Sequence, residues 1–260
     1  MLNITSKLYG GIFFSLIGIF IVLFMVLVIF PISLPNISEQ EKKKTLYDNF
    51  ENGTYKLELG KISPDGKWAS IYTGFGSMGV ERDHVNKGNN FFEIPQESLS
   101  SNVTHSSLAT TTKKYSDFDL TLDAMNVKQL RKNSPPNPWE SVWIMWHYTD
   151  NFHWYALQLK TNGIQLEKKD NDVKNDASEI FLVTKSSPVL NFGAWHKVRI
   201  LHQDSNTFTP HIQIWIDNEK VIDYVDNKTP NSETLSKEGA IGLYTEDAYV
   251  RFDNIYIKPL

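Results

Sequence analysis

The sequence predicts an all-β domain, folded as an antiparallel two-sheet sandwich and preceded by one transmembrane helix. Short aromatic and β-branched segments in which apolar and polar side chains alternate indicate strands with one buried face. Turn-forming residues separate these segments at intervals of roughly 8 to 12 residues, which favours a sandwich or jelly roll. With 260 residues, 41% of them hydrophobic, the chain can bury a large core.

The N-terminal apolar run is the predicted membrane segment. No charged residue occurs from Leu8 to Ser38, and an apolar stretch of this length can cross about 30 Å of hydrocarbon as a helix. We therefore expect a short tail at 1–8, a transmembrane helix at 9–31, and a polar stem at 32–44 that leads into one β-sandwich domain at 45–260.

The predicted strands follow a two-residue period. Phe118, Leu120 and Leu122 face one way, while the residues between them are polar. The same alternation occurs at 142–147, 155–160 and 211–216. Turn chemistry predicts hairpin loops at 149–151 and 161–163, a loop at 191–193 and a turn at 217–218. Adjacent strands are therefore expected to be mostly antiparallel.

Composition excludes several classes of function. The net charge of −4 leaves no basic surface that could follow a phosphate backbone, so we expect no nucleic-acid partner. The chain has no cysteine, which excludes a disulfide framework, a zinc ribbon and a cysteine nucleophile. Its seven histidines occur at no HExxH spacing, so a zinc-protease motif is also missing.

Segments in the last third of the chain resemble laminin G-like and related concanavalin A-like domains. Residues 193–200 (GAWHKVRI) and 212–221 (IQIWIDNEKV) resemble the W-H-x-V-x-I and I-x-x-W-x-D-G-x-x-V patterns of these domains. Residues 239–244 and 250–255 resemble their G-x-I-G-L and F-D-N-V ending. The resemblance covers Tyr47–Ile257 and implies a concanavalin A-like jelly roll.

The central strands resemble 3-keto-disaccharide hydrolase domains. Residues 146–147 and 155–158 are similar to the F-R and Y-E-x-Q strands of these domains, and residues 49–53 and 63–68 resemble the opening of archaeal membrane-anchored relatives. Two positions depart from the pattern, since His147 stands where the family has arginine and Ala156 where it has glutamate. Hydrolytic residues cannot be carried over at these two positions.

Alternation places an aromatic, polar-edged surface on neighbouring strands. If Ile144 and Tyr155 face the core, Trp143 and Trp154 face the other way, where indoles can stack on sugar rings and polar side chains can bond hydroxyls. The predicted carbohydrate-binding residues are Trp143, His147, Trp154, Gln158, Lys160, Gln165, Glu167, Trp215 and Arg131. The alternative is that Trp143 and Trp154 simply pack under loops or against the other sheet.

Two carboxylates are candidates for catalysis. Glu140 and Glu167 could act as proton donor and base, with His147 as an alternative proton shuttle. Arg131 and Glu140 flank the proline-rich loop 133–138, which is expected at the rim of the site. The alternative is that these carboxylates are solvated side chains of exposed strands.

The resemblance also implies a structural calcium ion between the first and last strands. Asp253, with Asp48 or Glu51, could supply the hard oxygen ligands that calcium prefers. The alternative is that Asp253 and Asn254 hydrogen-bond locally at a β-bulge.

Two signals disagree on the side of the membrane that holds the large domain. Lysines 42–44 beyond the helix outnumber Lys7 before it, which favours the cytoplasm. N-x-[ST] sequons favour the outside and lie at Asn36, Asn52, Asn102 and Asn227. With the resemblance, we expect a single-pass cell-membrane protein whose C-terminal domain is extracytoplasmic.

Three functions are therefore compatible with the sequence. The first is a membrane-anchored carbohydrate-binding, lectin-like domain. The second is a glycoside hydrolase of the 3-keto-disaccharide hydrolase type, which needs a carboxylate of perturbed pKa near the aromatic face. The third is a structural or adhesion domain, which would present a flat face without a pocket.

Overall fold

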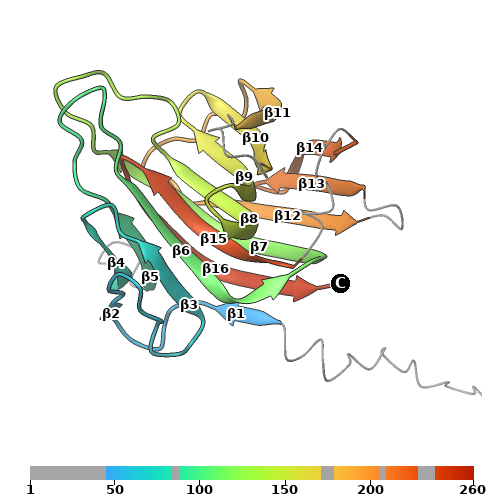
Figure 1. Ribbon diagram of the computed structural model, residues 1–260, viewed down its shortest axis with the longest axis horizontal. Helices are drawn as coiled ribbons and strands as arrows, with labels where there is room; N and C mark the ends of the chain where they lie inside the picture. Colours follow the sequence, from blue (N-terminus) through green and yellow to red (C-terminus); the bar gives the residue numbers. More distant parts are fainter. Residues whose placement is uncertain (1–44, 84–87, 171–178, 205–208, 228–237) are drawn as a thin grey trace, which may run out of the picture. The chain divides into compact units, whose positions relative to one another are not determined.

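The computed structural model describes residues 45–83, 88–170, 179–204, 209–227 and 238–260. These residues form an antiparallel two-sheet β-sandwich (Figure 1), as predicted, and none of them is helical. The predicted tail, transmembrane helix and stem lie outside these residues. Within the described ranges, no helix is long and apolar enough to cross a membrane.

The larger sheet has nine strands. In spatial order it contains β14 (Glu219–Val225), β13 (Pro210–Ile216), β12 (His196–Asp204), β7 (Phe118–Gln129), β16 (Ala248–Pro259), β5 (Asn89–Ile94), β4 (Ser77–Arg82) and β2 (Tyr55–Lys56). The ninth strand, β1 (Leu46–Asp48), pairs antiparallel with β16, so the first and last strands are neighbours (Figure 1).

The smaller sheet has seven strands. Its spatial order is β11 (Ile180–Lys185), β10 (Gly163–Asp170), β9 (His153–Lys160), β8 (Val142–Asp150), β15 (Gly239–Glu246), β6 (Ser106–Tyr115) and β3 (Trp68–Tyr72). Strands β8, β9 and β10 are consecutive antiparallel neighbours, as the predicted hairpin loops require. Strand β15 inserts between β8 and β6, which brings the C-terminal part of the chain into the centre of this sheet.

One hydrophobic core lies between the sheets. In β7, Phe118, Leu120 and Leu122 are buried while the residues between them are partly exposed, which confirms the predicted alternation. The smaller sheet contributes Trp146 and Tyr155, whose rings stack with centroids 5.6 Å apart. Each fully buried large apolar side chain of this core stabilises the fold by about 1.5–3 kcal/mol.

The turn between β13 and β14 shows how local sequence fixes strand pairing. Asp217 and Asn218 have φ values of 51° and 71°. Two consecutive residues of positive φ are the requirement of a type I′ hairpin turn, and Asp and Asn tolerate this conformation better than most residues. The predicted turn at 217–218 is therefore confirmed.

Strands β8 and β9 differ from their prediction. Both were expected to bury one face, but both faces are buried over nearly their whole lengths. Outside the main core, Trp143, Met145 and Trp154 form a second apolar cluster with Tyr244 of β15. Large aromatic side chains on the outer face of adjacent strands cover one another, and this buries a face that was expected to be exposed. Alternation therefore assigned each side chain to a face but did not show how exposed that face is.

Candidate functional site

Two adjoining hollows lie on the outer face of the seven-stranded sheet. The first has a volume of about 530 Å³ and is lined by Leu59, Tyr72, Thr73, Gly74, Phe75, Thr104, His105, Ser106, Met145, Asn151, Trp154, Lys169, Glu179, Tyr244 and Glu246. The second has a volume of about 430 Å³ and is lined by Trp139, Trp143, Gln158, Lys160, Gln165, Glu179, Phe181 and Glu246. Because both hollows share Glu179 and Glu246, we call them together the outer groove.

Aromatic side chains make the floor of the outer groove. Strand register places Tyr244 of β15 opposite Trp143 of β8, with ring centroids 5.0 Å apart, and Trp143 lies 6.4 Å from Trp154 of β9. The two indole N–H groups donate to the backbone oxygens of Trp139 and Asn151, at 2.8 and 3.3 Å. The floor is therefore a fixed apolar surface, with both indole N–H donors already bonded.

Exposed aromatic side chains stand at the two ends of the outer groove. Phe75 is 85% exposed beside the first hollow, while Trp139 and Phe181 are 42% and 63% exposed beside the second. Their position at the rims makes them suitable stacking surfaces for a ligand in the hollows.

A chain of polar side chains crosses β9 and β10 beneath the second hollow. Lys160 Nζ donates to Gln165 Oε1 at 2.7 Å, and Gln165 Nε2 donates to Glu167 Oε2 at 3.0 Å. Gln158 Nε2 donates to the other oxygen, Oε1, of Glu167 at 2.6 Å. Both oxygens of this buried carboxyl group therefore accept a hydrogen bond from a glutamine.

The carboxyl groups of the outer groove are hard to ionise. Burial, and then the nearby charge of Glu179, raise the pKa of Glu246 to about 7. Burial raises the pKa of Glu167 to about 7 as well, against the opposing hydrogen bond from Gln158. The pKa of Glu179 is also raised, chiefly by desolvation of its carboxyl group, although the residue as a whole is exposed. Carboxyl groups with pKa values near neutrality are suited to exchanging protons at pH 7.

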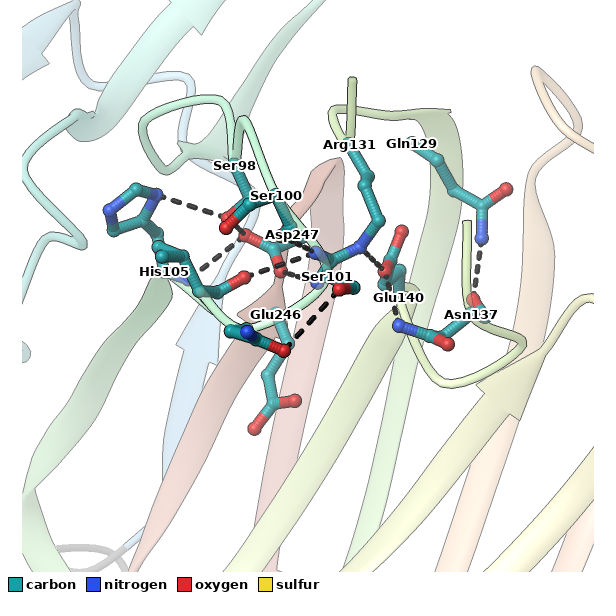
Figure 2. Close-up of polar contacts among 12 residues, drawn as sticks. Ser98, Ser100, Ser101, His105, Gln129, Arg131, Asn137, Glu140, Glu246 and Asp247 are labelled. Atoms are coloured by element: carbon teal, nitrogen blue, oxygen red, sulfur yellow. Dashed lines mark hydrogen bonds and ion pairs between the residues drawn. The ribbon is translucent and has the colours of Figure 1, made fainter. Parts of the chain in front are cut away.

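A buried ionic network holds Glu246 in place through its neighbour Asp247 (Figure 2). Asp247 has a φ of 43°, and this turn directs its side chain into the network while Glu246 points away from it. Arg131 Nη2 donates to Asp247 Oδ2 at 2.6 Å, and the Arg131 Nε donates to Glu140. Because all three charged groups of the network are buried, breaking it is expected to disturb the turn that presents Glu246.

The same network ties down the loops beside the first hollow. Arg131 Nη1 donates to the backbone oxygens of Ser100 and Val103, at 2.5 and 3.1 Å, and the His105 backbone N–H donates to Asp247 Oδ1 at 2.9 Å (Figure 2). The loop between β5 and β6 is thereby fixed to the end of β15. His105 also lines the first hollow, so the network positions both this residue of the hollow and Glu246.

Comparison of the sequence with protein families now identifies the domain. Residues 46–258 match the family described as the 3-keto-alpha-glucoside-1,2-lyase-like domain. The chain belongs to this family. The resemblance to 3-keto-disaccharide hydrolase domains is thus confirmed over nearly the whole β-sandwich. No curated protein matches the sequence.

Solved structures of other proteins share the fold of this lyase-like domain. A mutant of alginate lyase Aly36B in complex with alginate tetrasaccharide has a TM-score of 0.53 at 13% identity, over 84% of this chain and 97% of that one. The Ca²⁺-bound VIP36 exoplasmic/lumenal domain scores 0.51 at 10% identity, over 84% and 91%. The carbohydrate-binding module CBM66 from Bacillus subtilis scores 0.50 at 14% identity, over 74% and 95%. At these identities the likeness shows a common concanavalin A-like sandwich.

The lyase-like domain brings six of the predicted binding residues together on one face. Trp143, Gln158, Lys160 and Gln165 line the second hollow, and Trp154 lines the first. Glu167 lies beneath them, bonded to both glutamines. However, Trp143 and Trp154 are almost completely buried, so they form the floor and do not project as stacking platforms.

His147 is not on this face, and its expected position was wrong. A register shift in β8 begins after Trp146, and His147 adopts a φ of 51°, which turns its ring inward. The ring lies 4.3 Å from that of His202, and burial followed by His202 lowers the pKa of His147 to about 3. Gly239 permits this bulge, because a Cβ there would lie 2.2 Å from the His147 carbonyl carbon.

Arg131, Glu140 and Trp215 also differ from their predicted positions. Arg131 and Glu140 were expected at the rim of the site but are buried together in the ionic network. Trp215 was expected on the same binding face as Trp143, yet it belongs to β13 in the other sheet, where Arg199 lies 4.6 Å above its ring. Sequence alternation assigns a face within one strand but does not show which sheet the strand joins.

The residues predicted to hold calcium make other bonds in the structure, and the calcium ion stays a prediction. Asp48 accepts the Trp68 indole N–H at 2.8 Å and pairs with Lys67 at 3.2 Å, so its oxygens are already bonded. Glu51 accepts the Asn89 backbone N–H. Burial, then the charge of Asp123, raises the pKa of Asp253 to about 6. No group of three or more His, Cys, Asp or Glu able to hold a metal occurs among the described residues.

Sequence reasoning missed Tyr244, Glu246 and Glu179. The first two follow Gly242 at the two-residue period along β15, so extending the recognised strand by two residues would have placed them on one face. What the sequence did not show is that β15 pairs with β8, which puts Tyr244 opposite Trp143. Glu179 precedes β11 in a segment with no periodic signal.

Proposed function

We propose that this domain binds a carbohydrate in the outer groove. The observation that carries the proposal is the groove itself, in which a fixed aromatic floor and exposed aromatic rims surround Gln158, Lys160 and Glu246. Sugar rings have apolar C–H faces that pack on aromatic rings and hydroxyl groups that both donate and accept hydrogen bonds. A polar, uncharged or weakly charged ring compound fits such a surface better than a purely apolar ligand.

The comparisons support a carbohydrate ligand. The family description names a glucoside, and structures of the same fold include a carbohydrate-binding module and an alginate lyase in complex with alginate tetrasaccharide. Shared fold alone does not transfer a ligand. The position of the two hollows on one sheet face gives the proposal its independent support in this chain, and it disfavours a structural or adhesion domain with a flat face.

Substitution of an exposed rim residue tests the proposal. The full-length chain is screened on a glycan array, and Trp139→Ala is compared with Trp215→Ala. We expect Trp139→Ala to weaken glycan binding about fivefold, because it removes one stacking surface. Trp215→Ala should bind like the wild type, because Trp215 lies on the other sheet. Absence of glycan binding by the wild-type chain would refute the proposal.

A second candidate function is cleavage of a 3-keto glycoside by elimination. The family description, together with a carboxyl group of pKa about 7 in the groove, favours it. A ketone at C3 acidifies the C2 proton of a sugar. A carboxylate could remove that proton while the C1–O bond breaks and a C1–C2 double bond forms. The leaving oxygen then takes a proton from the carboxylic acid so formed or from water, and the aglycone alcohol is released. Glu246 is the candidate base because it borders both hollows, whereas Glu167 is buried beneath the glutamines.

Turnover of a 3-keto-α-glucoside tests the second function. The wild-type chain should release the aglycone and form the unsaturated 3-keto sugar, which absorbs in the ultraviolet. Glu246→Gln should reduce the rate by 10²-fold or more, on the order expected for loss of a general base, while it retains substrate binding. If the wild type binds this substrate without converting it, the domain is a binding module only.

We also propose that residues 9–31 anchor the domain to the cell membrane with the sandwich outside. The apolar composition of this segment supports the anchor, and the family resemblance and the sequons support the orientation. Protease treatment of intact cells should degrade the β-sandwich if it is extracytoplasmic. Its protection in intact cells, with degradation after lysis, would reverse the orientation.

A further inference from the structure

Carboxyl groups lie where the two hollows of the outer groove meet. Glu179 and Glu246 form the boundary that the two hollows share, and Glu167 lies beneath the second. One lysine lines each hollow: Lys160 donates to Gln165 in the second, and Lys169 lies in the first, where its charge acts on Glu179 and its ammonium lies 5.5 Å from the centre of the Phe152 ring. Among the described residues, no ion pair joins either lysine to these glutamates.

The side chain of Gln158 independently indicates that the outer groove has room for a ligand that donates a hydrogen bond. This side chain is 3% exposed and lines the second hollow, and its amide nitrogen donates to Glu167. The amide oxygen, Oε1, has no hydrogen-bond partner among the residues that the structure describes. A buried acceptor without a donor costs about 1–3 kcal/mol, so a ligand that donates to this oxygen recovers that free energy.

The three common substituents of sugars differ in the bonds they can make. A hydroxyl group donates and accepts, an ammonium group only donates, and a carboxylate only accepts. A carboxylate placed between Glu179 and Glu246 would meet like charge whenever these two groups are ionised. An ammonium group there would favour the ionised form of both carboxyl groups, and charge-assisted hydrogen bonds are roughly twice as strong as neutral ones.

We infer that the outer groove selects an oligosaccharide that carries an amino sugar over Glu179 and Glu246, and that it rejects uronic-acid polymers. This inference rests on the proposed carbohydrate-binding function and specifies its ligand. Among the described residues, the two hollows, of about 530 and 430 Å³, share only these two glutamates. A chain of several sugars therefore crosses the carboxyl pair when it occupies both hollows and reaches the aromatic rims at both ends.

A matched set of oligosaccharides tests the inference. The full-length chain is titrated with α- and β-1,4-linked gluco-tetrasaccharides in three forms: neutral, 2-amino and 6-carboxylate. The amino form should bind about tenfold more tightly than the neutral form of the same linkage, and the carboxylate form more weakly than either. Tighter binding of the carboxylate form, or equal binding of the amino and neutral forms, overturns the inference and leaves the proposed function standing. Absence of binding to every form and to the wider glycan array refutes both.

Three variants assign the preference to the carboxyl pair. Glu246→Gln and Glu179→Gln should each weaken binding of the amino form more than binding of the neutral form, so that the ratio of the two affinities falls. The exposed position of Glu179 makes its variant informative even if Glu246→Gln fails to fold, which a thermal unfolding scan would reveal. Asp223→Asn, on the other sheet, is the matched loss of a carboxylate and should preserve the preference. Retention of the full amino preference in Glu179→Gln and in folded Glu246→Gln contradicts the inference.

Discussion

The outer faces of the two sheets handle charge in opposite ways. On the nine-stranded sheet, Arg199 bonds both oxygens of Asp119 at 2.8 Å, and Asp223 accepts from His211 and Lys220 at 2.7 and 2.8 Å. On the seven-stranded sheet, Glu167 and Glu246 accept only from uncharged groups, and their pKa values rise to about 7. The first face pairs its carboxylates with cations, whereas the carboxyl groups named on the second are bonded by uncharged groups of the described residues.

The tryptophans of the two faces show the same contrast. Trp215 lies between the cations of Arg199 and Lys220, at 4.6 and 5.5 Å from its ring, so its π face is already used. Trp143 is 3% exposed and packs against other rings. A surface that is apolar below, acidic at its centre and aromatic at its rim is therefore built for recognition, while the other outer face is a solvated surface with self-contained ion pairs.

Breaking the buried ionic network is expected to have the largest effect. Arg131→Met leaves Glu140 and Asp247 buried without their cation, and this should lower the free energy of unfolding by about 4 kcal/mol. Arg199→Met removes an exposed pair and should cost less than about 1 kcal/mol. The side chains of Arg131 and Glu140 are 1% and 0% exposed, against 40% and 25% for Arg199 and Asp119. Urea unfolding measures the free energy of unfolding of both variants. Equal losses would show that burial does not determine how much these ion pairs contribute to stability.

Removing a floor tryptophan should come next in size. Trp143→Ala opens a cavity among Met145, Trp154 and Tyr244, and we expect a loss of about 3 kcal/mol. Trp215→Ala on the other sheet should cost less than about 1 kcal/mol, because its ring is only partly buried. Both values come from urea unfolding at one pH. A loss in Trp143→Ala no larger than that in Trp215→Ala would mean that the floor is not a packed surface.

The raised pKa of Glu167 predicts that stability falls as pH rises. The folded chain holds this proton up to a pKa of about 7, while the unfolded chain loses it near 4.5. The contribution of Glu167 to the free energy of unfolding is therefore full below pH 4.5, falls as the pH rises from 4.5 to 7, and is then constant. Between pH 5 and pH 8, the free energy of unfolding of the Glu167→Gln variant should fall by about 2 kcal/mol less than that of the wild type.

Asp223→Asn is the control for this pH dependence. Hydrogen bonds from His211 and then Lys220 lower the pKa of Asp223, so this carboxylate is ionised throughout the pH range and its loss should leave the slope unchanged. Urea unfolding at a series of pH values measures both variants. An identical slope in Glu167→Gln and the wild type would rule out a raised pKa at this site.

The sequence predicted the sandwich well and the site in part, for a physical reason. Side-chain alternation is a local property, so it correctly separated Trp143 and Gln158 from the core residues between them. Strand pairing, in contrast, is a contact between distant segments. The pairing of β15 with β8 brings Glu246 to the groove, and the position of β13 in the other sheet keeps Trp215 away from it. The bulge that turns His147 inward depends on the close approach of Gly239, which alternation cannot anticipate.

The smallest predicted effect concerns Phe181 at the rim of the second hollow. Phe181→Ala should weaken binding of the preferred glycan about threefold, because it removes one of two exposed rings there. Its ring is 63% exposed, so the free energy of unfolding should change by less than about 0.5 kcal/mol. Titration calorimetry and urea unfolding separate the two quantities. The double variant with Trp139→Ala should lose more binding than either single variant if both rings contact the same sugar chain, and unchanged binding in the double variant would place the ligand away from this rim.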